Sequence, residues 1–428
     1  MRQLPAQEKN VRMGNKGDKP RVLLGHPNGN QNVRNVLSSL VEHGMLAEFW
    51  TSIAWNPQSR WNRLLPGSMR AQFARRSFPE APPSQVRTTP WREIVRLGAR
   101  STPLGRMLCT GEQPFSSIGT ALYFDDCVAR RLAQLQPGAV YAYEGVAHHT
   151  FREAARLGIA ALYELPSSYW YWERKLLTEE AQRNPDYAEL LPKLNDSAEY
   201  MRGKDEELRL ADYIFVPSEH VRQSLQGVVA EEKIRVIGYG APPVRPRKPV
   251  ARSAREPLKV LFAGSLIQRK GIGYLLEAVE MLGSQVELTM VGRQFRPNAK
   301  VGAACRRWNW IESLPHAQVL DVMLQSDVLV LPSLSEGCAL VVLEALACGL
   351  PVIVTPNTGS LGFVRDGQEG FVVPICRADA IAERLETLYR DRDLLAEMSR
   401  RAQETAAENS WENFRVNWAR VVGSLACF

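Results

Sequence analysis

Asp327-Val-Leu-Val-Leu-Pro-Ser333 is the stretch that decides how this chain folds. Its apolar run predicts a strand that is buried on both faces of a parallel sheet. A short helix ending near Gly349 follows, and Glu336 and Glu344 lie eight positions apart at its entrance. Backbone amides at a helix N-terminus are unsatisfied and attract anions, a diphosphate among them. The stretch therefore predicts an anion site flanked by carboxylates at the carboxyl edge of an α/β sheet.

The alternation of strands and helices extends in both directions from this stretch. In the second half we expect strands at 258–263, 286–291, 328–331, 351–355 and 371–374, and helices at 273–282, within 378–409 and at 411–425. In the first half we expect strands at 21–24, 139–143, 159–163 and 213–217, a glycine loop at 25–30, and helices at 33–41, 150–157 and 201–210. This pattern predicts two Rossmann-like, doubly wound α/β domains that face a central cleft, where ligands bind in such folds.

A proline-rich segment separates the two halves. Residues 242–257 hold five prolines among many cations and can form neither a helix nor a central strand. We therefore expect a loose segment at 1–20, a first domain at 21–241, a linker at 242–257, a second domain at 258–410, and a C-terminal helix at 411–428 that packs back on the first domain.

Composition narrows the class of protein. The chain has 428 residues, of which 45% are hydrophobic and 23% charged, which is enough for full cores in two domains. No signal peptide or membrane span is expected, so we place the protein in the cytoplasm. The seven cysteines form no C-x-x-C pair and the six histidines no H-x-x-x-H pattern. Neither a disulfide framework nor a metal site is predicted.

Positive charge is concentrated at the start of the chain. Residues 1–110 hold 17 Lys and Arg against 6 Asp and Glu, whereas the whole chain has a net charge of only +7. Nucleic acid is disfavoured as the partner because no nucleic-acid-binding motif accompanies the charge. An anionic membrane surface or a phosphorylated lipid is favoured, and a solvated face without a partner stays open. The residues that would form this surface are Arg63, Arg70, Arg75, Arg76, Arg92, Arg96, Arg100 and Arg106, with Trp61, Phe73, Phe78 and Trp91.

A cationic loop follows the first strand of the second domain. It reads Gly264-Ser-Leu-Ile-Gln-Arg-Lys-Gly271, and it brings Arg269 and Lys270 to the same edge of the sheet as the acidic helix entrance. Arginine suits bidentate contacts to phosphate, and lysine supplies a compact charge. The loop matches neither G-x-x-x-x-G-K-S/T nor G-x-G-x-x-G, which argues against a P-loop and against a nicotinamide-dependent oxidoreductase.

These motifs together resemble those of the retaining GT-B glycosyltransferases of family 4. The stretches that carry the resemblance are 262–271, 291–292, 330–337, 344–352 and 366–374, in the family's order and spacing. The first half resembles the family only in outline. The resemblance implies a GT-B fold, a nucleoside-diphosphate sugar as co-substrate and no required metal or other cofactor.

The resemblance also implies roles for individual residues. Glu336, Lys270 and Arg269 would be catalytic, with the two cations neutralising the diphosphate. Glu344 would accept hydrogen bonds from the ribose, and the 314–315 region would flank the base. The remaining donor-binding positions would be Gly264, Ser265, Gly292, Arg293, Gly337, Cys338, Ala339 and Leu340.

The first domain departs from the family where many members carry a catalytic-site histidine. The chain reads Tyr163-Glu-Leu-Pro there, so Glu164 takes over that neighbourhood, or His148 or His149 reaches in from the preceding loop. Gly29 and Asn30 of the opening loop are also expected on the acceptor side, and the aromatic cluster at 169–172 forms either core or a platform for a sugar ring.

The sequence therefore predicts a retaining, metal-independent glycosyltransferase. It would move a sugar from a nucleoside-diphosphate sugar to a glycan or lipid-linked acceptor, in cell-surface polysaccharide or lipopolysaccharide synthesis, at the inner membrane face. A sugar-nucleotide hydrolase or epimerase of the same fold, and an inactive nucleotide-binding scaffold, are the alternatives.

Overall fold

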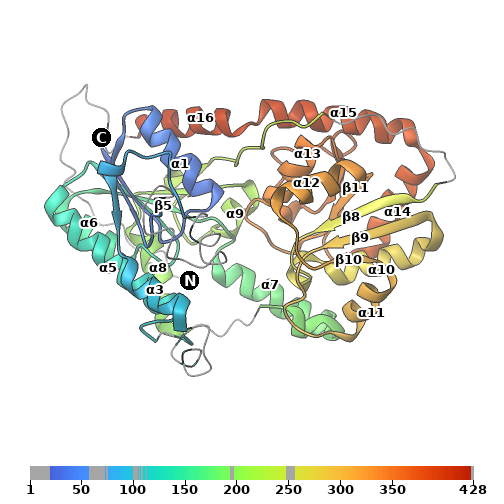
Figure 1. Cartoon of the computed structure of the whole chain (residues 1–428), viewed down its shortest axis with the longest axis horizontal. Coiled ribbons are helices and arrows are strands. Elements are labelled where there is room, and N and C mark those ends of the chain that lie inside the picture. The colour runs from blue at the N-terminus through green and yellow to red at the C-terminus, as the bar shows by residue number, and fades with distance from the viewer. Residues whose placement is uncertain are drawn as a thin grey trace.

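The structure is a computed structural model. It describes residues 20–425 except 57–72, 74–75, 100–104, 106, 108, 112, 193–196 and 247–255. The expected loose segment at 1–20 lies almost wholly outside the described residues, as do several members of the expected basic surface: Arg63, Arg70, Arg75, Arg100, Arg106 and Trp61. Two lobes, each built around a sheet, make up the molecule (Figure 1).

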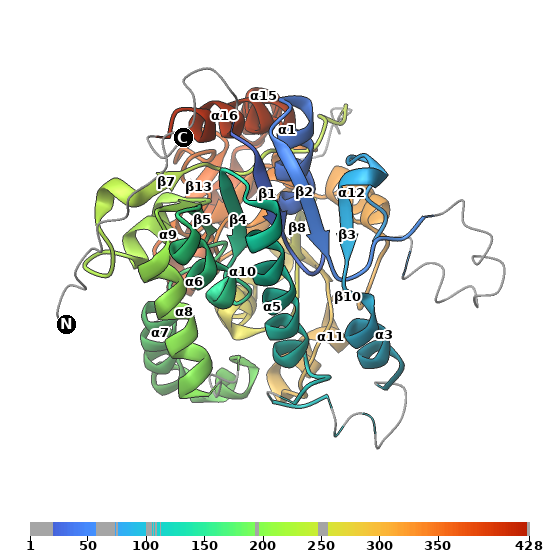
Figure 2. The same ribbon diagram turned by 90° about the vertical axis from the view of Figure 1, so that its left-hand side faces the viewer.

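The first lobe contains a seven-stranded parallel sheet in the order β3-β2-β1-β4-β5-β6-β7, seen from the side in Figure 2. Its strands are β1 (Val22–Gly25), β2 (Leu46–Thr51), β3 (Val86–Thr88), β4 (Ala139–Tyr143), β5 (Ala160–Glu164), β6 (Tyr213–Val216) and β7 (Ile234–Val236). All residues of β1, β4 and β5 are buried. The apolar runs that predict these strands are thus the centre of the sheet.

Helices connect the strands of this sheet. They are α1 (Gln31–Glu42), α3 (Pro90–Ala99), α5 (Ser117–Leu135), α6 (His148–Leu157), α7 (Trp170–Arg183), α8 (Ala198–Leu210) and α9 (Glu219–Ser224), with 3₁₀ turns η2 (Pro83–Gln85), η3 (Pro185–Leu190) and η4 (Glu231–Lys233). Local capping explains several of their ends. Asn30 begins α1 by accepting a hydrogen bond from the Val33 amide, and Ser116 begins α5 in the same way with Gly119.

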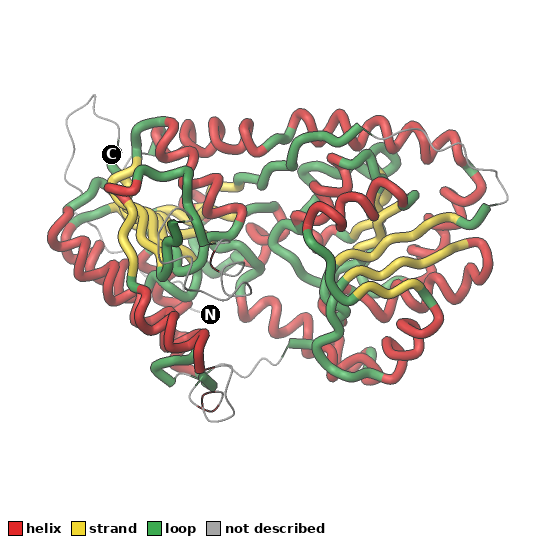
Figure 3. Tube along the Cα trace, viewed as in Figure 1, coloured by secondary structure: helices red, strands yellow, loops and turns green. Residues whose placement is uncertain are grey.

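The second lobe contains a six-stranded parallel sheet in the order β10-β9-β8-β11-β12-β13. Its strands are β8 (Leu258–Ala263), β9 (Val286–Val291), β10 (Asn309–Ile311), β11 (Val328–Leu331), β12 (Val352–Val354) and β13 (Gly370–Val372). Its helices are α10 (Ile272–Leu282), α11 (Ala299–Arg307), α12 (His316–Gln325), α13 (Leu340–Ala347), α14 (Ala378–Arg390) and α15 (Arg392–Glu408), with 3₁₀ turns η5 (Gln268–Lys270), η6 (Gly283–Gln285) and η7 (Pro356–Thr358). Figure 3 shows the two sheets as separate layers.

Both sheets have short strands that the apolar runs did not predict. β3, β7 and β10 are three-residue strands at sheet edges, and none is fully buried. An edge strand needs no continuous apolar run because it is only partly covered, so the periodic signal is weak there. The six-residue β2 was missed as well.

The segment formed by α7 and η3 follows β5 of the first sheet but packs on the second lobe (Figure 1). Glu180 on α7 is fully buried and accepts hydrogen bonds from Gln268 Nε2 at 2.6 Å and from the Tyr274 hydroxyl at 2.7 Å. Asn298 Nδ2 donates to the Asp186 carbonyl at 2.7 Å. The first half of the sequence thus supplies a support for the cationic loop of the second half.

The last helix, α16 (Trp411–Gly423), returns to the first lobe and runs beside α1 (Figure 1). Ser39 Oγ donates to the Arg415 carbonyl at 2.7 Å, and Trp418 is 1% exposed where its ring meets Tyr141 and Phe215. Apart from the excursion of α7 and η3, the chain therefore crosses between the lobes twice, once after β7 and once between α15 and α16. No helix in the described part of the chain is both long and apolar enough to cross a bilayer.

Candidate active site

The cationic loop forms a tight turn after β8. The 3₁₀ turn η5 ends at Gly271, whose φ of 73° lies in the left-handed region. Gly264 opens the loop at φ 151°, and a Cβ atom there would lie 3.0 Å from Lys270 Cδ. The Lys270 side chain is therefore folded back over the end of β8.

Glu336 lies between the two cations of this turn. Lys270 Nζ donates to Glu336 Oε1 at 2.7 Å, and Arg269 Nη1 lies 3.4 Å from the same oxygen. Arg269 also donates to the Ser335 carbonyl at 2.5 Å. The exposed fractions of the Arg269, Lys270 and Glu336 side chains are 24%, 16% and 14%, so this cluster is partly shielded from water and its charges are screened less than surface charges. The structure brings the three predicted catalytic residues together.

The amides before α13 are only partly free. Among the predicted donor-binding positions 337–340, the Ala339 amide is already engaged, because it donates to the Thr358 carbonyl at 3.1 Å. Within the part of the chain that the structure describes, the amides of Gly337, Cys338 and Leu340 have no hydrogen-bond partner. Buried amides are rarely left unpaired, and these lie at the positive end of a helix dipole. They are suited to an anion.

Glu344 lies one turn further along α13, and its side chain is 15% exposed. Its Oε1 lies 2.9 Å from His316 Nε2, and His316 begins α12 directly after the 314–315 region. Burial raises the pKa of Glu344, and the hydrogen bond with His316 opposes that rise. His316 was not predicted, because its proximity to Glu344 depends on how α12 packs against α13.

The other predicted donor positions form the floor of the site. Gly292 has φ 152°, and a Cβ atom there would lie 1.9 Å from the Gly264 carbonyl oxygen, so these two glycine turns touch. The Leu266 amide donates to the Arg293 carbonyl at 2.9 Å, while the Arg293 residue is exposed. Ser265 lies in the same turn and is partly exposed. Glycine is favoured at both positions by its positive φ, and at 292 also because the backbone of the other loop is too close for a side chain.

The first lobe touches the Glu336 loop directly. A Cβ atom on Gly337 would lie 1.7 Å from the Pro166 carbonyl oxygen, and Ser218 Oγ donates to the Gly337 carbonyl at 2.5 Å. Ser335 Oγ donates to Ser168 Oγ at 3.2 Å. The two lobes therefore meet on either side of Glu336.

Glu173, on the first turns of α7, was missed by the sequence analysis. Its Oε1 lies 4.0 Å from Arg269 Nη1, so the cation of one lobe faces a carboxylate of the other. Burial raises the pKa of Glu173, and Arg269 and Ser335 oppose the rise. The sequence did contain a signal for Glu173: it is an acid in the first turn of the helix that follows the strand ending at Glu164.

The residues expected on the acceptor side are dispersed. Glu164 is 4% exposed and accepts hydrogen bonds from the hydroxyls of Tyr141 and Tyr239 and from Asn32 Nδ2, so it belongs to the interior of the first lobe and does not line the cleft. Burial raises its pKa to about 7. Glu164 is therefore the shared acceptor of a buried hydrogen-bond network in the first lobe.

His148 and His149 begin α6 beside a cavity of about 240 Å³. His148 Nε2 lies 2.9 Å from Glu206, and His149 Nδ1 contacts Asp126. Lys204 also lines this cavity and pairs with Glu144 at 3.2 Å. Each histidine is therefore held by an acid of its own lobe.

The opening glycine loop has a structural role in the first lobe. A Cβ atom on Gly29 would lie 2.1 Å from the Phe78 ring, and the Asn30 side chain is engaged as the cap of α1. The aromatic residues at 169–172 differ in burial, since Tyr169 is 5% exposed and Tyr171 is 49% exposed.

The expected basic surface also needs correction. Arg96 is 8% exposed and forms a hydrogen-bonded ion pair with the buried Glu93, while Phe73 and Phe78 are buried in the lobe. The outer face of α3 instead carries Trp91, Ile94 and Val95, which are 48%, 51% and 41% exposed. This helix has its charges inside and its apolar side chains outside, the reverse of an ordinary surface helix.

Metal-binding side chains are also dispersed. Among the residues that the structure describes, no group of three or more His, Cys, Asp or Glu side chains could hold a metal ion.

Comparisons with known proteins bear on the second domain and on the fold. Residues 246–405 match the family described as "Glycosyl transferases group 1". The chain is 31% identical over 204 residues to a D-inositol 3-phosphate glycosyltransferase of Rhodococcus jostii (strain RHA1), covering 42% of this chain and 45% of that protein. It is 27% identical over 238 residues to the lipopolysaccharide core biosynthesis glycosyltransferase LpsE of Rhizobium meliloti (strain 1021), covering 52% of this chain and 68% of LpsE. The chain thus spans about half the length of curated relatives that it matches.

Solved structures extend the likeness to both lobes. Sucrose-phosphate synthase from Thermosynechococcus elongatus superimposes with a TM-score of 0.65 at 19% identity, covering 94% of this chain and 98% of that one. HepE of Anabaena in complex with UDP-glucose gives a TM-score of 0.62 at 15% identity, covering 95% and 100%. The predicted GT-B fold is confirmed, and residues 246–405 form a domain of the glycosyltransferase group 1 type.

Proposed function

We propose that this chain is a retaining, metal-independent glycosyltransferase that moves a sugar from a nucleoside-diphosphate sugar to a glycan or lipid-linked acceptor. The observation that carries the proposal is the cluster of Lys270, Arg269 and Glu336 beside the free amides that precede α13. The glycosyltransferase names of the sequence relatives, and the UDP-glucose bound to HepE, support the same class of donor.

The reaction requires stabilisation of a departing diphosphate and of an oxocarbenium-like sugar. Lys270, Arg269 and the amides of Gly337, Cys338 and Leu340 offer positive charge and hydrogen-bond donors to the diphosphate, which is the work that a divalent metal does elsewhere. These groups are already held in place, so little reorganisation is needed when charge develops. Metal independence follows from this donor set as part of the proposal.

Glu336 has a second role in the unliganded protein. Because its carboxylate binds both cations, it keeps them near the site before the donor arrives. An incoming diphosphate competes for the same cations, which frees the Glu336 carboxylate to stabilise positive charge on the sugar ring. Glu344, with His316, is placed to bind the ribose.

The acceptor would bind on the first lobe, and we place the reaction at the cytoplasmic face of a membrane, in cell-surface polysaccharide or lipopolysaccharide synthesis. The exposed Trp91, Ile94 and Val95 of α3 support a membrane-facing surface, since aromatic and aliphatic side chains flanked by arginine bind lipid interfaces. Arg92 lies beside this face, with its guanidinium 5.2 Å from the centroid of the Trp91 ring and 4.3 Å from that of Tyr123.

A panel of nucleoside-diphosphate sugars tests the proposal. We expect purified protein to hydrolyse one donor slowly to free sugar and nucleoside diphosphate, with chelator present, and to transfer faster when the acceptor is added with retained anomeric configuration. A changed sugar without release would indicate an epimerase, and donor binding without turnover an inactive scaffold. Oxidation of NADH would indicate an oxidoreductase.

Co-sedimentation tests the membrane surface. Vesicles of phosphatidylglycerol and phosphatidylcholine should retain the protein, and Ile94→Glu should reduce the bound fraction severalfold because it places a charge on the apolar face. Val416→Glu, at a residue of α16 that is 55% exposed, is the matched control. Equal binding by both variants would contradict the placement of the surface on α3.

A further inference from the structure

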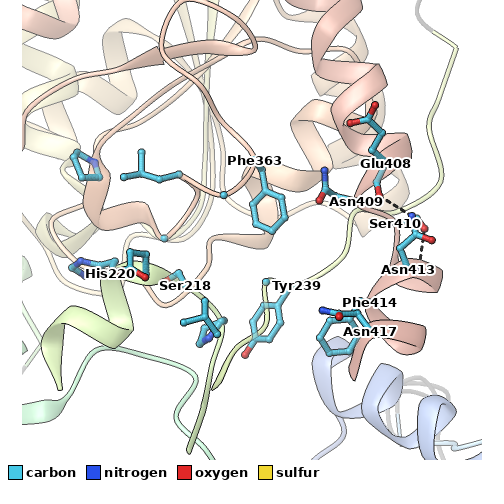
Figure 4. Close-up of a pocket in the computed structure, with 18 residues that line it drawn as sticks. Ser218, His220, Tyr239, Phe363, Glu408, Asn409, Ser410, Asn413, Phe414 and Asn417 are labelled. Carbon is cyan, nitrogen blue, oxygen red and sulfur yellow. Dashed lines mark hydrogen bonds between the residues drawn. The ribbon is translucent and has the colours of Figure 1, made fainter. Parts of the chain in front are cut away.

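A cavity of about 370 Å³ lies between the lobes, beside the helices that connect them (Figure 4). Four parts of the chain form its walls, one of them the segment 236–239 that holds the end of β7 and Tyr239. Ser218 and His220 come from the start of α9, Gly359 and Phe363 from the loop after η7, and Asn409 to Asn417 from the junction of α15 with α16. Its size lies within the range of pockets that bind small molecules.

This cavity is separate from the candidate active site. Its lining includes no residue of the cationic turn and none of the Glu336 loop. A close contact stands between the two sites: Ser218 Oγ donates to the Gly337 carbonyl, and a Cβ atom on Gly359 would lie 2.0 Å from that same carbonyl oxygen. A ligand in the cavity would therefore lie on the side of the Glu336 loop to which the Gly337 carbonyl points.

Aromatic rings form one side of the cavity. Tyr239, Phe363 and Phe414 are buried and line it, and Figure 4 shows the three rings around its edge. Trp411 stacks on Tyr239 with ring centroids 6.0 Å apart, and it contacts Phe414 edge to face. The Tyr239 hydroxyl is engaged with Glu164, so the aromatic ring rather than the hydroxyl is what this residue offers to a ligand.

Carboxamides line the cavity beside these rings, and Asn413 and Asn417 lie on the same helix as Phe414. Asn409 Nδ2 donates to the Thr405 carbonyl at 2.8 Å and Asn413 Nδ2 to the Glu408 carbonyl at 2.7 Å, which leaves the Oδ1 atoms of both as acceptors. Asn417 Oδ1 accepts from Arg420 at 2.7 Å, which leaves the Asn417 amide group as a donor. The cavity thus presents both donors and acceptors on fixed side chains.

The charge of the lining selects among ligands. No lysine or arginine is among the described residues that line the cavity, so nothing there compensates a phosphate or carboxylate. Glu219 is paired with Arg222, and Glu408 is exposed at the rim. Aromatic rings next to carboxamides suit a ring that has apolar C–H faces and hydroxyl edges.

We propose that this cavity is a binding site for a neutral saccharide, distinct from the donor site. The walls come from both lobes, so an occupant stabilises their present arrangement by mass action. Two routes connect the cavity to the active site. One is the contact of Ser218 with Gly337, and the other runs from His220 Nε2 to Ser168 Oγ at 3.0 Å and on to Ser335 Oγ at 3.2 Å.

The chain offers a position on the cavity wall that can take a large side chain. A Cβ atom on Gly362 would meet no atom within 4 Å, and Gly362 lines the cavity, so Gly362→Trp adds an indole at its wall. Gly423→Trp is the matched control, because Gly423 is equally unobstructed and lies at the end of α16, outside the lining. Equal thermal unfolding midpoints for the two variants establish that both fold.

Saturation-transfer NMR with methyl glucoside, methyl galactoside, methyl mannoside, maltose, lactose and cellobiose at up to about 20 mM is the test. We expect at least one of these probes to bind, Gly362→Trp to weaken it at least tenfold, and Asn417→Ala to weaken it severalfold. Lys270→Ala should leave this binding unchanged, which separates the cavity from the donor site.

Three results would overturn the proposal. They are binding by no probe, binding that Lys270→Ala abolishes and Gly362→Trp does not, and preference for glucose 6-phosphate or glucuronate over the neutral sugars. None of them bears on donor hydrolysis, so failure here is distinguishable from failure of the proposed glycosyltransferase activity.

Discussion

The two walls of the cleft hold their charges in different ways. On the second lobe, Lys270 and Glu336 pair with each other, and both come from short contiguous stretches next to strand ends. On the first lobe, Glu144, His148 and His149 are each held by a residue of that lobe, whereas Glu173 on α7 faces Arg269 of the second lobe. The second wall is therefore a self-contained charge cluster suited to chemistry, whereas the first is a largely neutralised surface suited to recognition and alignment.

Removing a member of the charge cluster on the second lobe tests most directly whether that wall carries out the chemistry. Glu336→Ala and Lys270→Ala should each lower kcat about a hundredfold or more, the usual effect of losing one preorganised electrostatic group. Steady-state transfer assays measure this, with Lys259→Ala as control because Lys259 is exposed on β8. Near-wild-type turnover in Glu336→Ala would remove the assignment of chemistry to the second wall.

Glu180 tests whether α7 truly supports that wall. Glu180→Ala leaves Gln268 Nε2 and the Tyr274 hydroxyl without their buried acceptor, so we expect unfolding free energy to fall by about 2–4 kcal/mol. Urea unfolding measures the loss. Glu179→Ala, one residue away and exposed, should change it by no more than about 0.5 kcal/mol. Similar values for the two variants would mean that α7 is not a support.

Glu164 provides a test on the first lobe. Because this acid is buried in the interior, its replacement should change stability more than activity. Its folded pKa of about 7 lies above the ordinary 4.5, so the native state keeps a proton that the unfolded state releases. The stabilising contribution of Glu164 is thus fully present below about pH 4.5 and is lost as pH rises through about 7.

Glu164→Gln removes this titration and keeps the shape of the side chain. We expect the unfolding free energy of wild type, relative to Glu164→Gln, to decline between pH 5 and 8 by on the order of 2 kcal/mol. Denaturant unfolding at several pH values checks it. A constant difference across that range would show that Glu164 is ionised in the folded protein.

Glu344 should give the smallest effect of the four. Glu344→Ala removes a proposed ribose contact that is equal in ground and transition states, so the donor KM should rise about tenfold while kcat changes little. His316→Ala should raise KM less, because His316 only positions Glu344. A fall in kcat without a change in KM would place Glu344 in the chemical step.

The sequence was most informative where structure depends on neighbours along the chain. The central strands follow from apolar runs, and the meeting of Arg269, Lys270 and Glu336 follows from two loops at one sheet edge. Glu173, His316 and the contact of Ser218 with Gly337 depend on how helices and lobes dock, which no local pattern encodes. The buried pair of Glu93 and Arg96 was missed because α3 reverses the usual rule that charged side chains face water.

Gly337 affects how the two lobes fit together as well as the shape of its own loop. Gly337 has no Cβ atom, which allows the Pro166 carbonyl of the first lobe to pack directly against its backbone. The distance between the two lobes at this point therefore depends on glycine. Any larger residue at that position would collide with the Pro166 carbonyl and force the two lobes apart beside Glu336. The absence of a side chain at Gly337 therefore determines how closely the two lobes can approach each other at this point.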